Sequence, residues 1–340
     1  MLNVYNHWDK LKTCIVGKSY SPKFYDFVSD TNIRNKLRIV AEQTEEDLDN
    51  LSKQLQKFGV QVIRPVVTDN YKDVLYGNKL LPAPISPRDY TAVIDNKVFM
   101  PSPHNRGLYN KLRGTDWPLM PPTCNTIDGF AIEDLYNYDH SWLKDVQDFV
   151  EKQGNEIVYD MDIDSAMVHR VGDTLYVGNW SPGDTWVVEK LVELFPNKRI
   201  QLIETHGHLD GCICIVSPNL VITRPNMDIT FLDKEVYTIN ITNLRITKPG
   251  TWWLPSELTS AKFEDYISTY LQHWIGNIQE TYVGVNMLMV DPSNVFCSNE
   301  DEDLFNALER HNITPHVVPF RHEWFWDNGL HCVTSDLDRC

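Results

Sequence analysis

The sequence predicts an α/β fold in which one unit, a β-hairpin followed by an amphipathic helix and a further short strand, recurs about five times and closes into a ring. Three observations lead to this prediction. Apolar runs of five to seven residues turn on Asp-Asn, Gly-Asp or Pro-Asn and return as a second β-like run. Most of these pairs precede a helix-like segment and another apolar run. The first and last strand-like runs of the chain each lack a neighbour.

The units follow one another along the chain with unequal spacing. Hairpins are predicted over Thr91–Met100, Met167–Gly178, Cys212–Thr223 and Gly284–Cys297. Helices are predicted around Arg38–Lys57 and over 142–154, Asp184–Phe195 and Glu300–His311, leading to short strands at 60–66, 155–160, 199–204 and 314–320. The unpaired runs LKTCIVG (11–17) and GLHCVTS (329–335) are expected to pair, which would remove the free sheet edges and enclose a central channel. Because no Pro, Gly and Ser-rich linker interrupts the chain, residues 1–340 are predicted to form a single domain.

Composition excludes several classes of partner. The chain of 340 residues is 42% hydrophobic, enough for a large core, and its net charge of −16 opposes binding to nucleic acid or to anionic membranes. No apolar stretch approaches the ~20 residues of a membrane-spanning helix, and the first residues lack the pattern of a signal peptide, so a cytoplasmic location is expected. Seven cysteines without a CxxC pair fit free thiols in a reducing compartment, and Cys212 and Cys214 are expected in the core.

Residues with acid, base or nucleophile chemistry gather where predicted strands begin or end. They are Asp89 in SPRDY, Asp162 and Asp164 in DIDSAM, His206, His208 and Asp210 in THGHLDG, and Cys332 in GLHCVTSD. On an extended backbone, His208 and Asp210 would share one face. An imidazolium near a thiol lowers the thiol's pKa and supplies a proton to a leaving amine, while a carboxylate fixes the imidazole tautomer. Two further carboxylates can grip a planar guanidinium.

Each of these residues also has a structural interpretation. A lone cysteine is most often buried in a core, the Asp of PRD is a common turn residue, and an HxD pair is common on surfaces. His169, His206 and His331 are the histidines that could take the place of His208.

These motifs, in this order, resemble the amidinotransferase branch of the guanidino-group-modifying enzymes, which includes glycine amidinotransferase and the inosamine-phosphate amidinotransferases. The resemblance runs nearly end to end, from YNHWDKLKTCIVGKS through PRD, IDSAMVHRVGDTLY, HLD and VNMLMVD to HCVTSDLDR. HCVTSDLDR and HLD together are specific, whereas PRD alone is weak. The resemblance implies the pentein fold, a five-bladed α/β propeller with quasi-fivefold symmetry. It also implies chemistry without a metal or organic cofactor, and it is compatible with a homodimer.

The resemblance assigns a role to individual residues. Cys332 matches the nucleophile, His208 the general acid and base, and Asp164 the carboxylate partner of that histidine. Asp89 and Asp210 match the acids that hold the guanidino group. The implied reaction transfers an amidino group from L-arginine to an acceptor amine, with glycine giving guanidinoacetate and ornithine, through an amidino-cysteine.

Some positions depart from the family's pattern. Met227 stands where glycine-using members carry an arginine suited to the donor's α-carboxylate, and Arg224 is the nearest replacement. Gln279 and Glu280 replace a pair of serines, and Met167 replaces an aspartate. These departures leave the identity of donor and acceptor open.

Three functions therefore compete. The first is amidino transfer from L-arginine to glycine or another small amine. The second is hydrolysis of a guanidine by an arginine deiminase-like enzyme of the same superfamily, in which water replaces the acceptor. The third is a binding protein on the same scaffold, which retention of Cys332, His208 and the three aspartates disfavours.

Overall fold

The structure is a computed structural model of the chain. It describes residues 1–71, 75–76, 79–80, 83–89, 91–100, 126–127, 130–131, 141–159, 165–179, 186–205, 208–230, 232, 235–239, 260–267, 271 and 284–340. Asp162, Asp164, His206, Gln279 and Glu280 lie outside the described residues.

The described strands form five three-stranded sheets of one design, an antiparallel pair whose second strand pairs in parallel with a third. The sheets are β5–β6–β9 (Ala92–Ile94, Lys97–Met100, Glu156–Tyr159), β10–β11–β12 (Val168–Val171, Thr174–Asn179, Arg199–Glu204), β13–β14–β15 (Ile213–Ile215, Leu220–Thr223, Glu235–Thr238), β16–β17–β18 (Leu288–Asp291, Asn294–Cys297, Thr314–Val317) and β19–β1–β2 (Thr334–Arg339, Leu11–Val16, Gln61–Ile63). Two short pairs, β3–β4 (Leu75–Tyr76, Lys79–Leu80) and β7–β8 (Thr126–Ile127, Phe130–Ala131), accompany them. The predicted repeat of a hairpin and a further strand is confirmed, and the structure adds that this third strand pairs in parallel.

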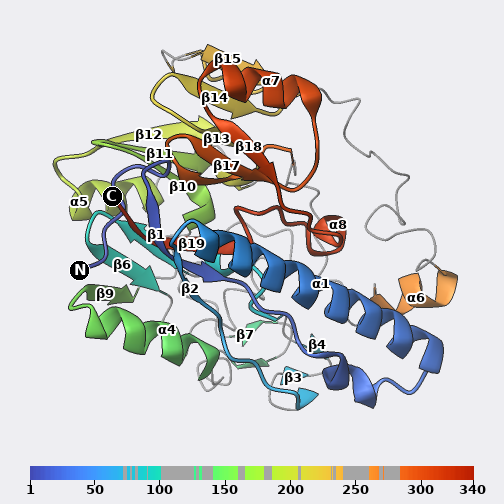
Figure 1. The fold of residues 1–340 in the computed structure, drawn as a ribbon. Coiled ribbons are helices and arrows are strands. Elements are labelled where there is room, and N and C mark those ends of the chain that lie inside the picture. Colours follow the sequence, from blue (N-terminus) through green and yellow to red (C-terminus); the bar gives the residue numbers. More distant parts are fainter. Residues whose placement is uncertain are drawn as a thin grey trace.

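The fifth sheet joins the two ends of the chain (Figure 1). Strand β19 pairs antiparallel with β1, with Thr334 opposite Val16 and Arg339 opposite Leu11, which confirms the predicted pairing. The predicted strand at 329–335 is wrong over its first five residues, because the strand begins at Thr334. Turn hydrogen bonds replace the sheet ladder there: the Val333 N–H bonds the Gly329 carbonyl, and the Thr334 hydroxyl donates to the Leu330 carbonyl.

The described helices are α1 (Thr31–Lys57), α4 (Ser141–Lys152), α5 (Trp186–Leu194), α6 (Ala261–Tyr266), α7 (Glu302–Arg310) and α8 (Glu323–Trp326). Four of them, α1, α4, α5 and α7, lie where helices were predicted, whereas α6 and α8 were not predicted. Helix α1 starts earlier than expected because Asp30 caps it, accepting hydrogen bonds from the N–H groups of Asn32 and Ile33. It ends just before Gly59, whose φ of 80° suits glycine at a helix terminus. Among the described helices, none has both the length and the apolar content to span a bilayer.

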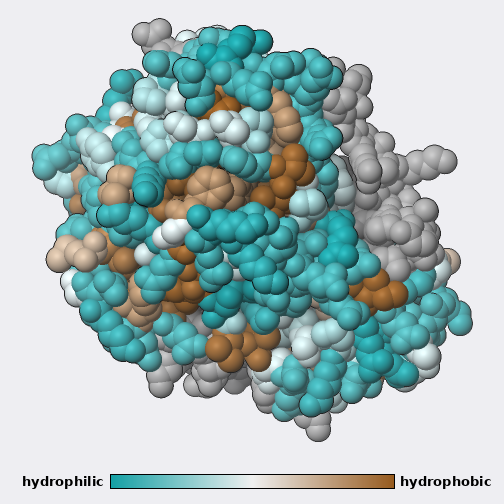
Figure 2. All heavy atoms as spheres, viewed as in Figure 1, coloured by the Kyte–Doolittle hydropathy of each residue, from teal (hydrophilic) through white to brown (hydrophobic). Residues whose placement is uncertain are grey.

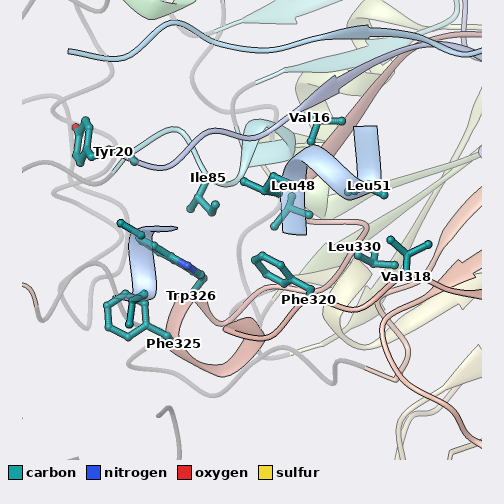
Figure 3. Packing of buried hydrophobic residues seen from close by; sticks show 14 of the residues in the cluster. Val16, Tyr20, Leu48, Leu51, Ile85, Val318, Phe320, Phe325, Trp326 and Leu330 are labelled. Carbon is teal, nitrogen blue, oxygen red and sulfur yellow. The ribbon is translucent and has the colours of Figure 1, made fainter. Parts of the chain in front are cut away.

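The largest apolar cluster packs α1 against the segment that precedes the C-terminal strand. Figure 3 shows Leu48 and Leu51 of α1 near Phe320, Trp326 and Leu330, all of them buried. Burying such side chains contributes roughly 1.5–3 kcal/mol each. On the face shown in Figure 2, hydrophilic residues cover most of the surface, and apolar residues reach it only in patches.

Three of the sheets are preceded by a short 3₁₀ turn. The turns are η3 (Pro87–Asp89) before β5, η4 (Ser165–Met167) before β10 and η5 (Leu209–Gly211) before β13, and a further one, η1 (Pro22–Phe27), precedes α1. Turn η4 packs against both η3 and η5, and β19 packs against η3. The 3₁₀ turns of these three units therefore lie next to one another. The turn before β19 lies in the same region, because β19 packs against η3.

Candidate active site

Cys332 lies in the turn before β19, and only 2% of its surface is exposed. Its thiol donates to Asp210 Oδ2 over 3.4 Å. The side-chain amide of Asn286 donates to the sulfur over 3.0 Å, and the Cys332 backbone N–H donates to Asn286 Oδ1 over 2.9 Å. The thiol is thus packed inside the molecule but set against a carboxylate and an amide rather than against apolar side chains alone.

Asp210 lies in η5, and its two carboxylate oxygens differ in their hydrogen bonding. Oδ2 accepts from the Cys332 thiol and from His331 Nδ1 at 2.7 Å, whereas Oδ1 is buried without a hydrogen-bond partner among the described residues. A buried acceptor left open is costly unless a ligand fills it. Oδ1 is therefore a candidate contact for a bound N–H donor.

Asp89 and His208 complete this corner of the molecule. His208 caps η5, and its Nδ1 lies 3.9 Å from Asp89 Oδ1 at the end of η3. The Asp89 side chain is 16% exposed, against 1% for Asp210, so it is the more open of the two acids. The expectation of an extended backbone at HLD is wrong, because His208 and Asp210 flank Leu209 in a 3₁₀ turn. The turn still brings both residues to the same corner.

Burial and neighbouring charges raise the pKa values of Asp210 and Cys332. Burial raises the pKa of Asp210 to about 6; His208 and Arg88 oppose the rise and Asp89 adds to it. Burial, followed by repulsion from Asp210 and Asp89, raises the pKa of the Cys332 thiol well above its usual value. A cation bound between the two acids would cancel the repulsion and lower the thiol's pKa. A bound cationic ligand would therefore favour formation of the thiolate.

The other predicted residues take varied positions. Arg224 follows β14 and donates from Nη2 to the Thr205 carbonyl over 2.7 Å, in the strand-to-turn segment that leads to His208. Met227 is half-buried and packs against the core. Cys212 and Cys214 are buried in that core, and among the described residues no group of three or more His, Cys, Asp or Glu could hold a metal ion.

Sequence reasoning gave no role to two residues that hold this site together, Asn286 and Arg88, and named His331 only as an alternative to His208. Asn286 stands at the start of the VNMLMVD segment, and His331 immediately precedes the cysteine. Arg88, inside the PRD motif, is fully buried and donates from Nε to the His331 carbonyl over 2.8 Å. An arginine beside the aspartate of PRD and an asparagine at the head of an apolar strand are the sequence signals that could have identified Arg88 and Asn286.

Comparison with known proteins places this geometry in context. No family model matches the sequence. The chain is 22% identical over 376 residues to inosamine-phosphate amidinotransferase 1 of Streptomyces griseus, covering 100% of this chain and 97% of that protein. The structure of an amidinotransferase from Microseira wollei, of the saxitoxin biosynthetic pathway, superposes with a TM-score of 0.66 at 17% identity, covering 99% and 97% of the two chains. The structure of inosamine-phosphate amidinotransferase from Streptomyces griseus gives a TM-score of 0.65 at 18% identity, covering 100% and 97%.

The five repeated sheets of the described residues, closed by β1 and β19, define the class of protein: the chain has the α/β propeller fold of the penteins. The relatives named above are amidinotransferases matched from end to end. The structure of a dimethylarginine dimethylaminohydrolase also superposes, with a TM-score of 0.53 at 12% identity, covering 97% of this chain. The resemblance predicted from PRD, HLD and HCVTSDLDR is thereby confirmed.

Proposed function

We propose that this protein is an amidinotransferase that moves the amidino group of L-arginine to an acceptor amine, with glycine as acceptor, giving ornithine and guanidinoacetate. One observation carries the proposal: the Cys332 sulfur lies 3.4 Å from Asp210 Oδ2, while Asp210 Oδ1 is buried and open. A flat cation with several N–H donors is the ligand that such a pair of acids, Asp210 and Asp89, suits best. The relatives' amidinotransferase names support the same reaction.

In the proposed first half-reaction, the guanidinium of arginine binds between Asp89 and Asp210. Cys332 gives its proton to His208, and the thiolate forms a C–S bond to the central guanidinium carbon. The C–N bond to the ornithine nitrogen then breaks, and that nitrogen takes the proton from His208. The enzyme is left with an S-amidino cysteine.

In the second half-reaction the acceptor amine replaces ornithine. It gives a proton to His208 and attacks the amidino carbon, and the C–S bond breaks to return the Cys332 thiolate. Asp164 is proposed as the carboxylate partner of His208, and Arg224 as the residue that meets the donor's α-carboxylate. The proposal extends to a cytoplasmic location, since a nucleophilic free thiol suits a reducing compartment. It also includes a homodimer, on the family resemblance alone.

The test is incubation with L-arginine, with and without glycine, followed by mass spectrometry of the products. We expect ornithine and guanidinoacetate only when glycine is present. Equal amounts of citrulline in both tubes would show a hydrolase instead, and a panel of amines identifies the acceptor if glycine is not used.

The nucleophile is tested by substitution. Cys332→Ala should abolish transfer and leave the melting temperature nearly unchanged, while Cys340→Ser, at the exposed C-terminus, should keep full activity. A large loss of stability in Cys332→Ala with activity retained would assign Cys332 to the core and remove it from the reaction.

A further inference from the structure

Among the described residues, the Asn286 side chain makes three hydrogen bonds, and each of them joins it to Cys332 or Asp210. Its Nδ2 donates to the Cys332 sulfur at 3.0 Å and to the Asp210 carbonyl at 3.0 Å. Its Oδ1 accepts from the Cys332 backbone N–H at 2.9 Å. Asn286 is 2% exposed and stands just before β16, on a unit that supplies none of the residues assigned above.

The orientation of this amide is fixed from its other side. A Cβ on Gly329 would lie 2.6 Å from Asn286 Cβ and 2.7 Å from its Oδ1, so only glycine fits there. The Asn286 carbonyl also accepts from the His331 N–H at 3.3 Å. The close approach of Gly329 and the three hydrogen bonds together hold the amide with its Nδ2 directed at the sulfur.

We propose that Asn286 is a catalytic residue that stabilises the Cys332 thiolate by donating Nδ2–H to the sulfur; this rests on the proposed function. An N–H donor favours a thiolate over a thiol, because the charged sulfur is the stronger acceptor. Repulsion from Asp210 and Asp89 raises the pKa of the thiol. The hydrogen bond that the Asn286 side chain donates to the sulfur opposes this rise.

The same donor serves both halves of the reaction. Sulfur carries negative charge when it attacks arginine and again when the acceptor displaces it. A neutral amide holds that charge without giving up its own proton, so it leaves the proton transfers to His208. A fixed donor also costs no reorganisation when the charge appears.

Two substitutions separate this role from a packing role. Asn286→Asp keeps the shape and an acceptor for the Cys332 N–H but sets a carboxylate oxygen against the sulfur. Asn286→Ala removes the donor without adding charge. Stabilisation of the thiolate predicts that Asp is the more damaging substitution, whereas a packing role predicts that Ala is, because it leaves a cavity and an unpaired Cys332 N–H.

The measurement is the rate at which iodoacetamide alkylates Cys332, followed by peptide mass spectrometry from about pH 7 to about pH 11. The exposed Cys340 in the same samples is the internal reference. We expect alkylation at neutral pH to fall on the order of 10- to 100-fold in Asn286→Asp and less in Asn286→Ala, with the pH midpoint moved upward in both. The arginine half-reaction should slow in the same order.

Asn294→Asp is the matched control, since Asn294 lies at the far end of the same hairpin and bonds Asp291 and His316. It should leave alkylation of Cys332 unchanged. Melting curves identify the variants that are folded, and an unchanged pH midpoint in both folded Asn286 variants would overturn the proposal. Alkylation needs no substrate, so a failure of arginine turnover in the parent protein would overturn the proposed reaction while leaving this test valid.

Discussion

At the residue scale, Asp210 is the group on which the chemistry of the corner depends. Its Oδ2 is held by His331 and Cys332, and burial raises its pKa to about 6. His331 stays neutral, because burial and then Arg88 lower its pKa well below the usual value, so its Nδ1–H donates to the carboxylate. Asp210 is thus ionised at neutral pH but close to protonation.

The pH dependence of the first half-reaction follows from this pKa. Below about pH 6 Asp210 takes up a proton and loses the charge that attracts a guanidinium. We expect kcat/KM for arginine to fall as pH decreases through about 6. A profile that stays level well below that pH would remove Asp210 from substrate binding.

The raised pKa of Asp210 also lowers the stability of the folded protein at neutral pH. A carboxyl whose folded-state pKa is raised binds protons more tightly in the folded protein, so its ionisation costs stability as pH rises from about 4 to about 6. Asp210→Asn should therefore lose activity yet unfold with about 1–3 kcal/mol more difficulty at neutral pH, as measured by urea denaturation.

At the element scale, one stretch of α1 holds the segment that carries the nucleophile. The Arg321 backbone N–H donates to Asp47 over 2.7 Å and its Nε donates to the same carboxylate over 2.9 Å. Trp326 Nε1 donates to the Thr44 hydroxyl over 3.0 Å, and His322 meets Gln43 over 2.8 Å. Residues 43, 44 and 47 share one helix face, so a single face fixes the approach to Cys332.

Asp47→Ala should therefore affect the nucleophile as well as the fold. We expect a loss of about 1–2 kcal/mol in stability and a lower kcat, because the segment 321–331 loses its anchor. Glu46→Ala is the control: Glu46 pairs with the same arginine, but its side chain is 59% exposed, and it should change stability by less than about 1 kcal/mol. If Asp47→Ala unfolds more easily but keeps its kcat, the anchor serves stability alone.

At the scale of the whole molecule, a buried ionic cluster occupies the place where the units meet. Arg88, Arg170 and Arg339 all bond the single carboxylate of Asp336 at 2.8–3.0 Å, and every member is at most 2% exposed. Arg170 also donates to the Val93 carbonyl, and Arg339 to that of Met289. The cluster therefore ties four units together.

The expected central channel is therefore filled, in the described residues, by this charged cluster. Its net charge is positive, since three guanidinium groups share one carboxylate. Burial alone would raise the pKa of Asp336, but Arg170, Arg88 and Arg339 together hold it well below its usual range.

Asp336→Asn should be strongly destabilising, because three buried guanidinium groups lose their counter-charge. We expect a loss of about 3–5 kcal/mol in the free energy of unfolding, measured by urea denaturation. The depressed pKa means that this contribution persists above the unfolded carboxyl's pKa and declines only as pH falls through the lower folded value. Asp338→Asn, two residues along the same strand and partly exposed, should cost less than about 1 kcal/mol, and equal losses in both would contradict the role of the cluster.

Much of the fold was predictable because its signals are local. Alternation of apolar and polar residues is read over a few positions, so the sequence predicts the four hairpins and four helices with boundary errors of a few residues, except that α1 begins at Thr31 rather than near Arg38. The turn at Gly329–Val333 was taken for a strand, because an apolar run does not reveal the side-chain hydrogen bonds that bend it. The 3₁₀ turn at HLD is too short to leave a periodic pattern, and it is held by backbone bonds from the Gly211 and Cys212 N–H groups to the carbonyls of His208 and Leu209.

The sequence by itself determined the repeating unit, the pairing of the two chain ends and the set of reactive residue types, because patterning and motif chemistry need only neighbouring letters. Only the tertiary structure decided which of those residues meet. Cys332 and Asp210 are 122 positions apart, Asn286 is 46 positions from the thiol, and Arg88 is 248 from Asp336. Contacts over such separations arise from how the units pack around a common centre, and no local pattern encodes that packing.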